Sequence, residues 1–494
     1  MTVWERAVYA EPMARLGAED NSVHDAATVT GLLDQLTPTS APGPLEPSSR
    51  PVALDTADRF PPVPAPAPPT WVERMLVLVT VFVIIHELPM DWFRTRDDFL
   101  AVQGNPRLIV LQLLLMVLGI ARVAGWFNWI IRAVQIDVTL MALAGLALVS
   151  TLWSADPPQT LKEAAILFTV TAYGTYLVLR FTLAEILELL ARVFAVSGFL
   201  NLGFILALPQ YGISTEGLWD GVFFQKNSLG FSSLLAIPIL IVVGRSGPAW
   251  RHLYYLCIPV WFTLLIGSQS KTMLVATLGS CALLLVYRTF RSRRTLRGAF
   301  LVAVIALSTL TVAVATANIE LLADWLDKDI TLTGRVPLWQ GLTPIIAEQP
   351  YLGYGYKAAF GGYFSPVHEV WVSEGWEPTH AHNGILQTWL DLGLVGVVVL
   401  VFGYVRATTR ALTMVSNSSG AIMLWPLVYL SSALLISITE SGVMNSREGW
   451  LLYVIAVVSA GLHARRRQQG PMRPIMPGRI GGSRNLRIRQ PAGR

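Results

Sequence analysis

Residues 384–405 read GILQTWLDLGLVGVVVLVFGYV, and this apolar run decides the class of fold. An α-helix rises about 1.5 Å per residue, so a run of about 20 residues crosses the hydrocarbon core of a bilayer. Apolar runs of about 17–24 residues recur along the chain from Trp71 to His463. Soluble helical proteins do not repeat such runs, so the sequence predicts an all-α, polytopic membrane protein.

The amino-acid composition agrees with this class. The chain has 494 residues, of which 53% are hydrophobic and 14% are charged, and its mean hydropathy is +0.51. In a typical soluble domain roughly a quarter of all residues are charged. The two cysteines, Cys257 and Cys281, lie inside apolar runs and form no zinc or disulfide pattern, so we expect them to act as small apolar side chains.

About twelve membrane spans are predicted, with both termini in the cytoplasm. The expected helices cover residues 71–89, 107–124, 137–153, 163–181, 185–208, 228–244, 251–267, 270–287, 299–317, 384–405, 421–438 and 447–463. Basic residues cluster in alternate loops, for example in 288–297 and 465–467, and the positive-inside rule places those loops in the cytoplasm. The net charge of +5 therefore reflects topology and does not indicate a nucleic-acid partner.

Three regions are predicted along the chain. Residues 1–70 are polar and rich in proline, which is typical of a disordered tail, and they contain no early apolar stretch of a signal peptide. The span that starts at Trp71 is therefore expected to act as an uncleaved signal anchor. Residues 71–463 form the membrane domain, and residues 464–494 form a basic, disordered cytoplasmic tail.

The longest polar break between predicted spans, residues 318–383, is expected to face the periplasm. It carries eight acidic residues against three lysines and arginines, which are Lys328, Arg335 and Lys357. A loop of this length is usually functional or disordered, and its tryptophans and tyrosines argue against disorder. Segments such as 337–347 are expected to form short helices on the membrane surface.

Arg335 is a candidate anion ligand in this acidic loop. A guanidinium binds phosphate or carboxylate through two parallel hydrogen bonds. The alternative is a structural ion pair with Asp327 or Asp329. Tyr354 belongs to the run QPYLGYGY at 349–356, whose glycines could form a tight turn that lets the backbone approach a ligand.

His380, His382 and Asn383 lie where the loop re-enters the membrane. No cysteine or close His-x-Glu spacing completes a metal set, so a metal site is not expected. Histidine titrates near neutral pH, which suits a general base. The alternative is a histidine that only makes interfacial hydrogen bonds.

Two lysines are expected at the outer ends of other spans. Lys226 and Asn227 belong to FQKN at 224–227, and Lys271 belongs to SQSKT at 268–272. A lysine at a helix end can simply extend its amine to the interface, which is the alternative to anion binding. No P-loop, nucleophile elbow or zinc motif occurs. Lysines, arginine and a histidine base on one side of the membrane suit a lipid-linked diphosphate donor and a hydroxyl nucleophile.

At these residues the chain resembles the O-antigen ligase/polymerase (Wzy-type) family of membrane proteins. The pieces that carry the resemblance are FQKN at 224–227, SQSKT at 268–272, TGR at 333–335 with Trp339, QPYLGYG at 349–355 and AHNGILQ at 381–387. They occur in the family's order around its long extracytoplasmic loop.

The resemblance implies a helical fold similar to GT-C glycosyltransferases. It also implies transfer of a glycan from undecaprenyl diphosphate to a hydroxyl, with neither a metal nor another cofactor. By position, His382 looks like the family's catalytic base and Arg335 like its diphosphate-binding arginine. Lys271 stands where ligases usually have arginine, which disfavours a ligase because lysine cannot bind phosphate in a bidentate manner.

We therefore predict a polymerase that joins lipid-linked repeat units into exopolysaccharide at the outer face of the bacterial inner membrane. One alternative is an O-antigen ligase that transfers glycan to lipid A-core, and another is a transporter of a small anion or a lipid-linked sugar. The predicted spans carry few ionisable residues at mid-membrane depth, which disfavours transport. A copolymerase that controls chain length is an expected partner of this family.

Overall fold

The computed structural model describes residues 68–86, 106–121, 135–223, 225–247, 251–291, 335–360, 365–375, 377–438, 440–441 and 443–468. The chain divides into two units, residues 1–65 and 66–494, and the first lies outside the described residues. So do residues 1–67 of the predicted tail 1–70, the predicted span 299–317, residues 318–334 of the predicted loop and residues 469–494 of the predicted tail 464–494. Residues 464–468 of that tail are helical, where disorder was predicted. Within the described ranges the structure is helical, with one isolated β-bridge between Ile213 and Trp219.

Every predicted helix that falls on described residues is present. The helices are α1 (Trp71–His86), α2 (Pro106–Ala121), α4 (Val138–Val149), α5 (Pro157–Arg180), α6 (Leu183–Ala207), α7 (Pro209–Gly212), α8 (Lys226–Arg245), α9 (Arg251–Gly267), α10 (Lys271–Phe290), α13 (Arg335–Glu348), α14 (His368–Glu374), α15 (Gly384–Asn417), α16 (Trp425–Ser437) and α17 (Arg447–Gln468). Two 3-10 turns, η3 (Ser150–Leu152) and η4 (Ala421–Leu424), extend α4 and precede α16.

Four of the described helices are long and apolar enough to cross a membrane: α6, α8, α10 and α15. Shorter apolar helices lie at Ile109–Gly119, Val138–Leu152 and Ala421–Ser437. The helical membrane class is thus supported, while the number of twelve spans stays a prediction.

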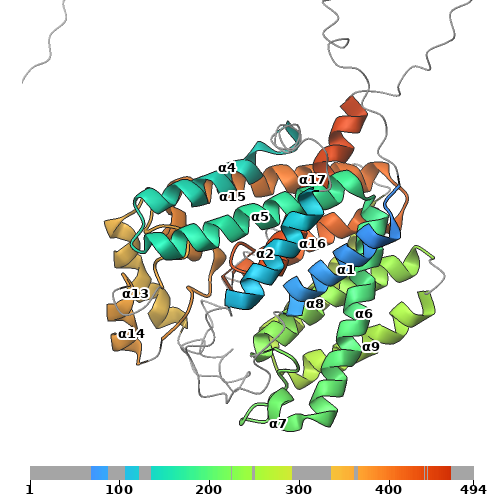
Figure 1. The fold of residues 1–494 in the computed structure, drawn as a ribbon, viewed down its shortest axis with the longest axis horizontal. Coiled ribbons are helices and arrows are strands. Elements are labelled where there is room, and N and C mark those ends of the chain that lie inside the picture. The colour runs from blue at the N-terminus through green and yellow to red at the C-terminus, as the bar shows by residue number, and fades with distance from the viewer. Residues whose placement is uncertain are drawn as a thin grey trace, which may run out of the picture. The chain divides into compact units, whose positions relative to one another are not determined.

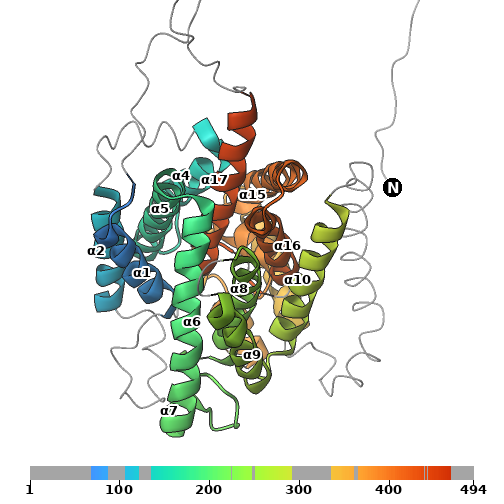
Figure 2. The same ribbon diagram turned by 90° about the vertical axis from the view of Figure 1, so that its right-hand side faces the viewer.

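One helical bundle forms the main apolar core. The last helix, α17, packs against α5, α15 and α16, and α8 packs against α6, α9 and α10 (Figures 1 and 2). Aromatic side chains tie helices together: Trp261 of α9 donates its indole N–H to the carbonyl of Phe194 in α6 at 2.9 Å. The absence of a side chain at Gly198 makes room for this indole, since a Cβ there would lie 2.9 Å from its nitrogen.

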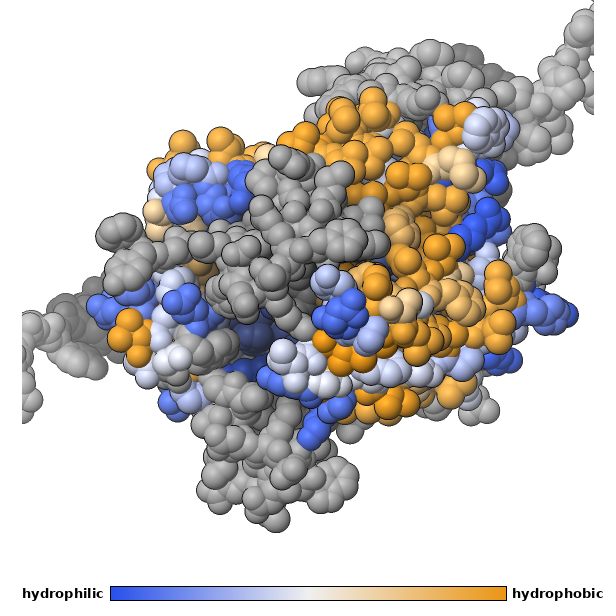
Figure 3. All heavy atoms as spheres, turned by 60° about the horizontal axis from the view of Figure 1, so that its bottom comes forward, coloured by the Kyte–Doolittle hydropathy of each residue, from blue (hydrophilic) through white to orange (hydrophobic). Residues whose placement is uncertain are grey.

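The outside of the helices is also apolar. Leu206, Val275, Ile266 and Val110 are between 63% and 70% exposed. Figure 3 shows apolar side chains covering a broad part of one face, with hydrophilic residues along its edges. Soluble monomers do not expose apolar patches of this extent, so this surface fits a lipid environment.

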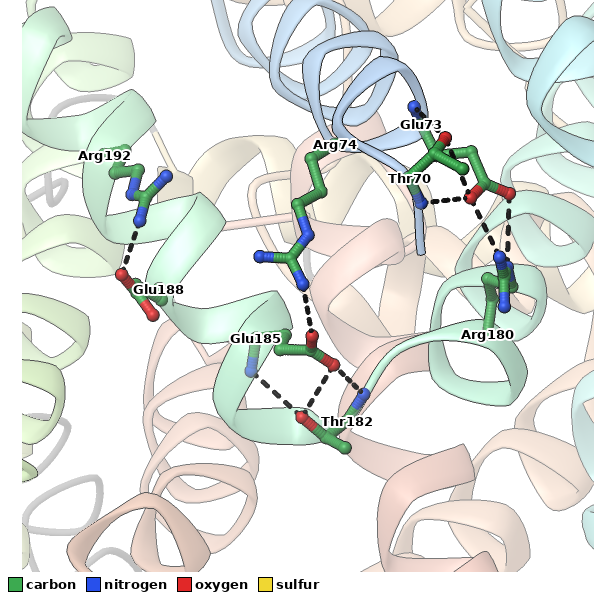
Figure 4. A network of polar contacts seen from close by, with 8 residues as sticks. All are labelled: Thr70, Glu73, Arg74, Arg180, Thr182, Glu185, Glu188 and Arg192. Carbon is green, nitrogen blue, oxygen red and sulfur yellow. Dashed lines mark hydrogen bonds and ion pairs between the residues drawn. The ribbon is translucent and has the colours of Figure 1, made fainter. Parts of the chain in front are cut away.

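Ion pairs join the helix ends that the charge pattern places in the cytoplasm. Glu73 at the start of α1 pairs with Arg180 at the end of α5 at 2.8 Å, and Arg74 pairs with Glu185 of α6 at 3.0 Å (Figure 4). Thr182 and Glu185 form a capping box that starts α6. Because Glu73 and Arg180 are mostly buried, this pair fixes α1 against α5 more firmly than an exposed pair would.

The helix α15 is broken at Gly393, whose φ of 67° and ψ of −170° are not helical. The break leaves backbone N–H and carbonyl groups of α15 without partners in the helix. The backbone of residues 349–356 supplies the missing hydrogen-bond partners. Tyr354 and Gly355 donate backbone N–H groups to the carbonyls of Leu390 and Asp391 at 2.9 and 3.0 Å. The N–H of Leu394, after the break, donates to the carbonyl of Pro350 at 2.9 Å.

This arrangement explains the glycines at 349–356, and the explanation differs from the prediction. A Cβ on Gly353 would lie 2.6 Å from the carbonyl oxygen of Leu390, and one on Gly355 would lie 2.5 Å from Oγ of Ser154. The glycines therefore let this segment approach helix α15 and the residues before α5. From the sequence we expected them to let the backbone approach a ligand instead. The same break places Asp391 before the kink, buried within the protein although its sequence lies in an apolar run.

Candidate active site

The described part of the long loop has its own apolar core. Leu338, Leu342 and Ile345 of α13 pack with Val367 and Val370 at α14, and Ala381 and Leu390 complete this core at the start of α15. Figure 1 shows α13 and α14 next to each other at one end of α4, α5 and α15. A folded loop can hold side chains in fixed positions, and residues 337–347 do lie in a helix as predicted.

Three parts of the chain meet at one carboxylate. Arg335, the first residue of α13, donates from Nη2 to Oε1 of Glu440 at 2.8 Å. His382, just before α15, places Nδ1 3.3 Å from the other oxygen, Oε2, of Glu440. Their side chains are only 13% to 17% exposed. The two residues that the sequence singled out as anion ligand and base are thus brought together.

Glu440 lies in the turn that follows α16, and its backbone N–H donates to the carbonyl of Ile436 at 2.8 Å. Sequence reasoning missed this residue. The available signal was its isolation, because Glu440 is the only charged residue between Arg410 and Arg447. An acid in such an apolar stretch is costly unless it is paired, which marks it as a functional candidate.

The surroundings of Glu440 favour its ionised form. Burial opposes ionisation, but the hydrogen bond with His382 and the charge of Arg335 outweigh it, so the pKa of Glu440 falls below its usual range. An ionised carboxylate only accepts hydrogen bonds. His382 therefore carries its proton on Nδ1, facing Glu440, and its Nε2 is the proton-accepting nitrogen.

His380 stacks edge-on against His382, with ring centroids 4.0 Å apart. Burial, followed by the nearby His382, lowers the pKa of His380 to about 4. His380 is therefore neutral near pH 7 and adds no positive charge beside the base. His382 itself has a φ of 48°, a left-handed conformation that is uncommon for a residue with a side chain.

Asn383 and Tyr354 have structural contacts. Oδ1 of Asn383 caps α15 by accepting from the N–H groups of Ile385 and Leu386, both at 3.0 Å. The hydroxyl of Tyr354 donates to the carbonyl of Ile345 at 2.9 Å and lies 3.1 Å from Glu348. These contacts account for both residues, so their predicted role in binding substrate stays a prediction.

The motifs that carry Lys226 and Lys271 meet at a second place, where the two lysines begin α8 and α10. Oδ1 of Asn227 accepts a hydrogen bond from the hydroxyl of Ser270 at 2.9 Å, and this bond joins the two lysine-bearing motifs. Gly230 allows the close approach, since its Cβ would lie 3.1 Å from that of Ser270.

An apolar cavity connects α8 with the Glu440 turn. Ile436 and Val443, which flank Glu440, line it together with Phe231, five residues after Lys226. The lysines thus begin helices that run beside this turn.

The cluster can accept a proton and can bind an anion. Nε2 of His382 can take a proton from a hydroxyl, and Glu440 stabilises the resulting imidazolium. His380, His382 and Glu440 also place ligand atoms within 4.8 Å of one another, as in a loose metal set. Arg335 already neutralises Glu440, however, and a neighbouring cation opposes the binding of a metal ion there.

Two comparisons with known proteins agree with the motifs. Residues 256–401 match the family model of O-antigen ligase. The exopolysaccharide production protein ExoQ of Rhizobium meliloti (strain 1021) is 28% identical over 197 residues, which cover 38% of this chain and 45% of the relative. The chain thus matches less than half of this relative's length. The predicted resemblance to the O-antigen ligase/polymerase family is confirmed, and the matched region includes Lys271, Arg335 and His382.

Proposed function

We propose that the protein is a polysaccharide polymerase of the inner membrane, with its active site at the periplasmic face and both termini in the cytoplasm. It joins oligosaccharide repeat units carried on undecaprenyl diphosphate. The observation that carries this proposal is the Arg335–His382–Glu440 cluster, of which Arg335 and His382 lie in the region similar to O-antigen ligases. The similarity to an exopolysaccharide production protein favours polymerisation.

In the proposed reaction, Nε2 of His382 takes the proton from the acceptor hydroxyl. The hydroxyl oxygen then forms a bond to C1 of the donor sugar, and the bond from C1 to the diphosphate oxygen breaks. The diphosphate leaves with the electron pair of that bond. Attack opposite the leaving group inverts the configuration at C1, and the described side chains supply the proton transfer without a metal ion.

Arg335 is proposed to stabilise the leaving diphosphate. Charge builds on the diphosphate as the bond to C1 breaks, and a positioned cation stabilises that charge in the transition state. A guanidinium carries five N–H donors, so a bond to Glu440 is compatible with a contact to the diphosphate. Lys226 and Lys271 would add positive charge from the outer ends of α8 and α10, and His380 and Asn383 would flank the acceptor.

The second candidate, an O-antigen ligase acting on lipid A-core, is favoured by the name of the matched family. The lysine at position 271 argues against it, because its amine cannot bind phosphate in a bidentate manner. A transporter is less favoured. Asp391 is one of the few ionisable residues within the predicted spans, and its buried carboxylate accepts a hydrogen bond from Gln387 at 3.0 Å inside the protein.

The test is complementation of a deletion host with His382→Ala and Arg335→Ala variants. We expect single repeat units in place of long polymer, at normal protein levels. The matched control is His368→Ala, a loop histidine on α14 outside the cluster. Full-length polymer from both site variants refutes the proposed site.

The kind of product separates the candidate functions. Polymer that stays on the lipid carrier, unattached to lipid A, indicates a ligase. Repeat units retained on the cytoplasmic side indicate transport. Loss of chain-length control on deleting a copolymerase would identify the expected partner.

A further inference from the structure

We propose that Gln387 and Trp339 are positioning residues that hold the catalytic histidine through the peptide of Ala381. This inference rests on the proposed function, in which His382 is the base. It concerns two side chains that touch neither the hydroxyl nor the diphosphate and act only through the backbone before His382.

The peptide groups of Ala381 are held from two helices. Its N–H donates to Oε1 of Gln387 in α15 at 2.8 Å. Its carbonyl accepts from the indole N–H of Trp339 in α13 at 2.9 Å. Ala381 is fully buried and Gln387 is 5% exposed, so water does not replace these bonds. Ala381, the residue directly before His382, is therefore fixed at both its backbone N–H and its carbonyl oxygen.

This fixation matters because of the backbone of His382. Its φ of 48° lies in the left-handed region, where a Cβ crowds the backbone. Such a conformation persists only when the surroundings impose it. Without the anchors on Ala381, the chain would relax toward a negative φ, and the imidazole would move away from Glu440.

The orientation of Gln387 follows from its partners. The N–H of Ala381 can only donate, so Gln387 must present its oxygen to it. Its amide nitrogen then donates to Oδ1 of Asp391 at 3.0 Å. The backbone carbonyl of Asp391 in turn accepts the N–H of Gly355 at the break in α15. A buried chain of hydrogen bonds thus connects the broken helix to the histidine.

Trp339 links the histidine to the arginine. Arg335 and Trp339 are four residues apart on α13, so they lie on one face of that helix. One helical turn therefore carries both the arginine that pairs with Glu440 and the indole that holds Ala381. The same rigid element sets the distance between the base and the cation.

The experiment uses the purified full-length protein and lipid-linked oligosaccharides extracted from the deletion host. The variants are Gln387→Met, Gln387→Glu and the double variant Gln387→Glu/Asp391→Asn. Gln387→Met keeps the volume and removes both hydrogen bonds. The double variant keeps an acceptor for Ala381 and restores the second bond in the reverse direction, with the new side-chain amide at position 391 as the donor.

We expect Gln387→Met and Gln387→Glu to lower kcat by about 10–100-fold, as a displacement of the base on the order of 1 Å does. KM should stay near the wild-type value, because the contacts of Arg335 do not depend on Gln387. The double variant should recover kcat to within about threefold of wild type, because the peptide anchor is re-formed. The matched control is Thr388→Val, since the hydroxyl of Thr388 bonds within its own helix, to the carbonyl of Gly384 at 2.7 Å.

A second pair of variants covers the case in which substitutions at Gln387 prevent folding. Trp339→Phe removes the N–H that holds Ala381 and keeps an aromatic ring, so it should lower kcat. Its control is Trp389→Phe, whose indole N–H donates to the carbonyl of Pro350 at 2.8 Å, away from the histidine. A smaller loss of kcat in the control supports the proposal, and equal losses refute it.

The outcomes separate the two proposals. If Gln387→Met and Trp339→Phe keep the wild-type kcat while His382→Ala and Arg335→Ala are inactive, the positioning role is wrong and the proposed function stands. If the double variant is as slow as Gln387→Glu, the hydrogen-bond chain is not what positions the base. If His382→Ala and Arg335→Ala are active, the proposed function itself fails.

Discussion

Replacing Glu440 by glutamine should convert His382 from a base into a non-productive tautomer. The substitution keeps the size and shape of the side chain, but an amide oxygen and an NH₂ group take the places of the two carboxylate oxygens. Arg335, which lies 2.8 Å from Oε1, can only donate and so takes the amide oxygen. The NH₂ group then faces Nδ1 of His382, 3.3 Å from Oε2 in the native protein.

His382 must then accept a hydrogen bond at Nδ1 and carry its proton on Nε2, which can no longer take a proton from the acceptor. A general base contributes about 10²–10⁴-fold to a rate, so we expect a loss of that size in Glu440→Gln. The hydrogen bond to Arg335 survives, now from a charged guanidinium to an uncharged amide oxygen. The loss of this ion pair should lower the free energy of unfolding, but the protein should still fold. Glu440→Asp keeps the charge but is one methylene shorter, and we expect about a tenfold loss from misplacement.

The assay measures the rate of polymer formation on lipid-linked repeat units extracted from the deletion host, together with the protein level and the thermal unfolding midpoint. Glu440→Gln that polymerises at the wild-type rate with a normal unfolding midpoint would refute the assigned tautomer. Loss of both activity and folding in Glu440→Gln, with Glu440→Asp normal in both, would mean that the carboxylate is needed mainly for structure.

Three further predictions concern pH, the helix break and metal ions. The pKa of His380 is about 4 in the folded protein and near 6.5 in the unfolded chain. Between these pH values the unfolded chain binds more protons, so the stability of the folded protein falls as the pH is lowered from 6.5 to 4. In His380→Gln the unfolding midpoint should depend less on pH in this range, and an unchanged dependence would contradict the assignment. Gly393→Ala should destabilise the protein by about 3 kcal/mol or more, because the φ of 67° and ψ of −170° at this position suit glycine alone and a Cβ would clash with Tyr351. The control Gly203→Ala in α6 should not destabilise the protein, because the space around its Cβ is open. Treating the purified protein with EDTA should leave the rate of polymer formation unchanged, and recovery of lost activity by one added divalent cation would show that the His380–His382–Glu440 set binds a metal.

The helices could be predicted because long apolar runs are visible in the sequence without any tertiary contact. Arg335 was singled out because lysine and arginine are few in an acidic loop, and His382 because histidine suits a general base and its position matches the family's motif. Glu440 was missed because its role depends on contacts with residues 58 and 105 positions away along the chain. A single acid in an apolar stretch shows that something pairs with it, but does not show what.

The roles of Gly393 and Tyr354 were hidden for a different reason. A glycine inside an apolar run reads as part of a continuous helix, since a break costs hydrogen bonds that a lipid environment cannot supply. Only the folded loop reveals that residues 349–356 supply them. Gly353 and Gly355 in that segment and Gly393 in the helix together allow the two backbones to pack closely and bond to each other. In the sequence, each of these glycines alone suggests only a flexible turn.

The break in α15 at Gly393 also has a consequence for how substrates would enter and leave the proposed polymerase. Residues 349–356 are bonded to α15 on both sides of its break, and Trp153 and Trp389 add indole hydrogen bonds to the carbonyls of Leu352 and Pro350. To swing this segment aside would unravel the helix that it completes. In the proposed polymerase this segment would therefore act as a fixed wall, and the exchange of glycan and carrier between turnovers would have to be gated elsewhere on the protein.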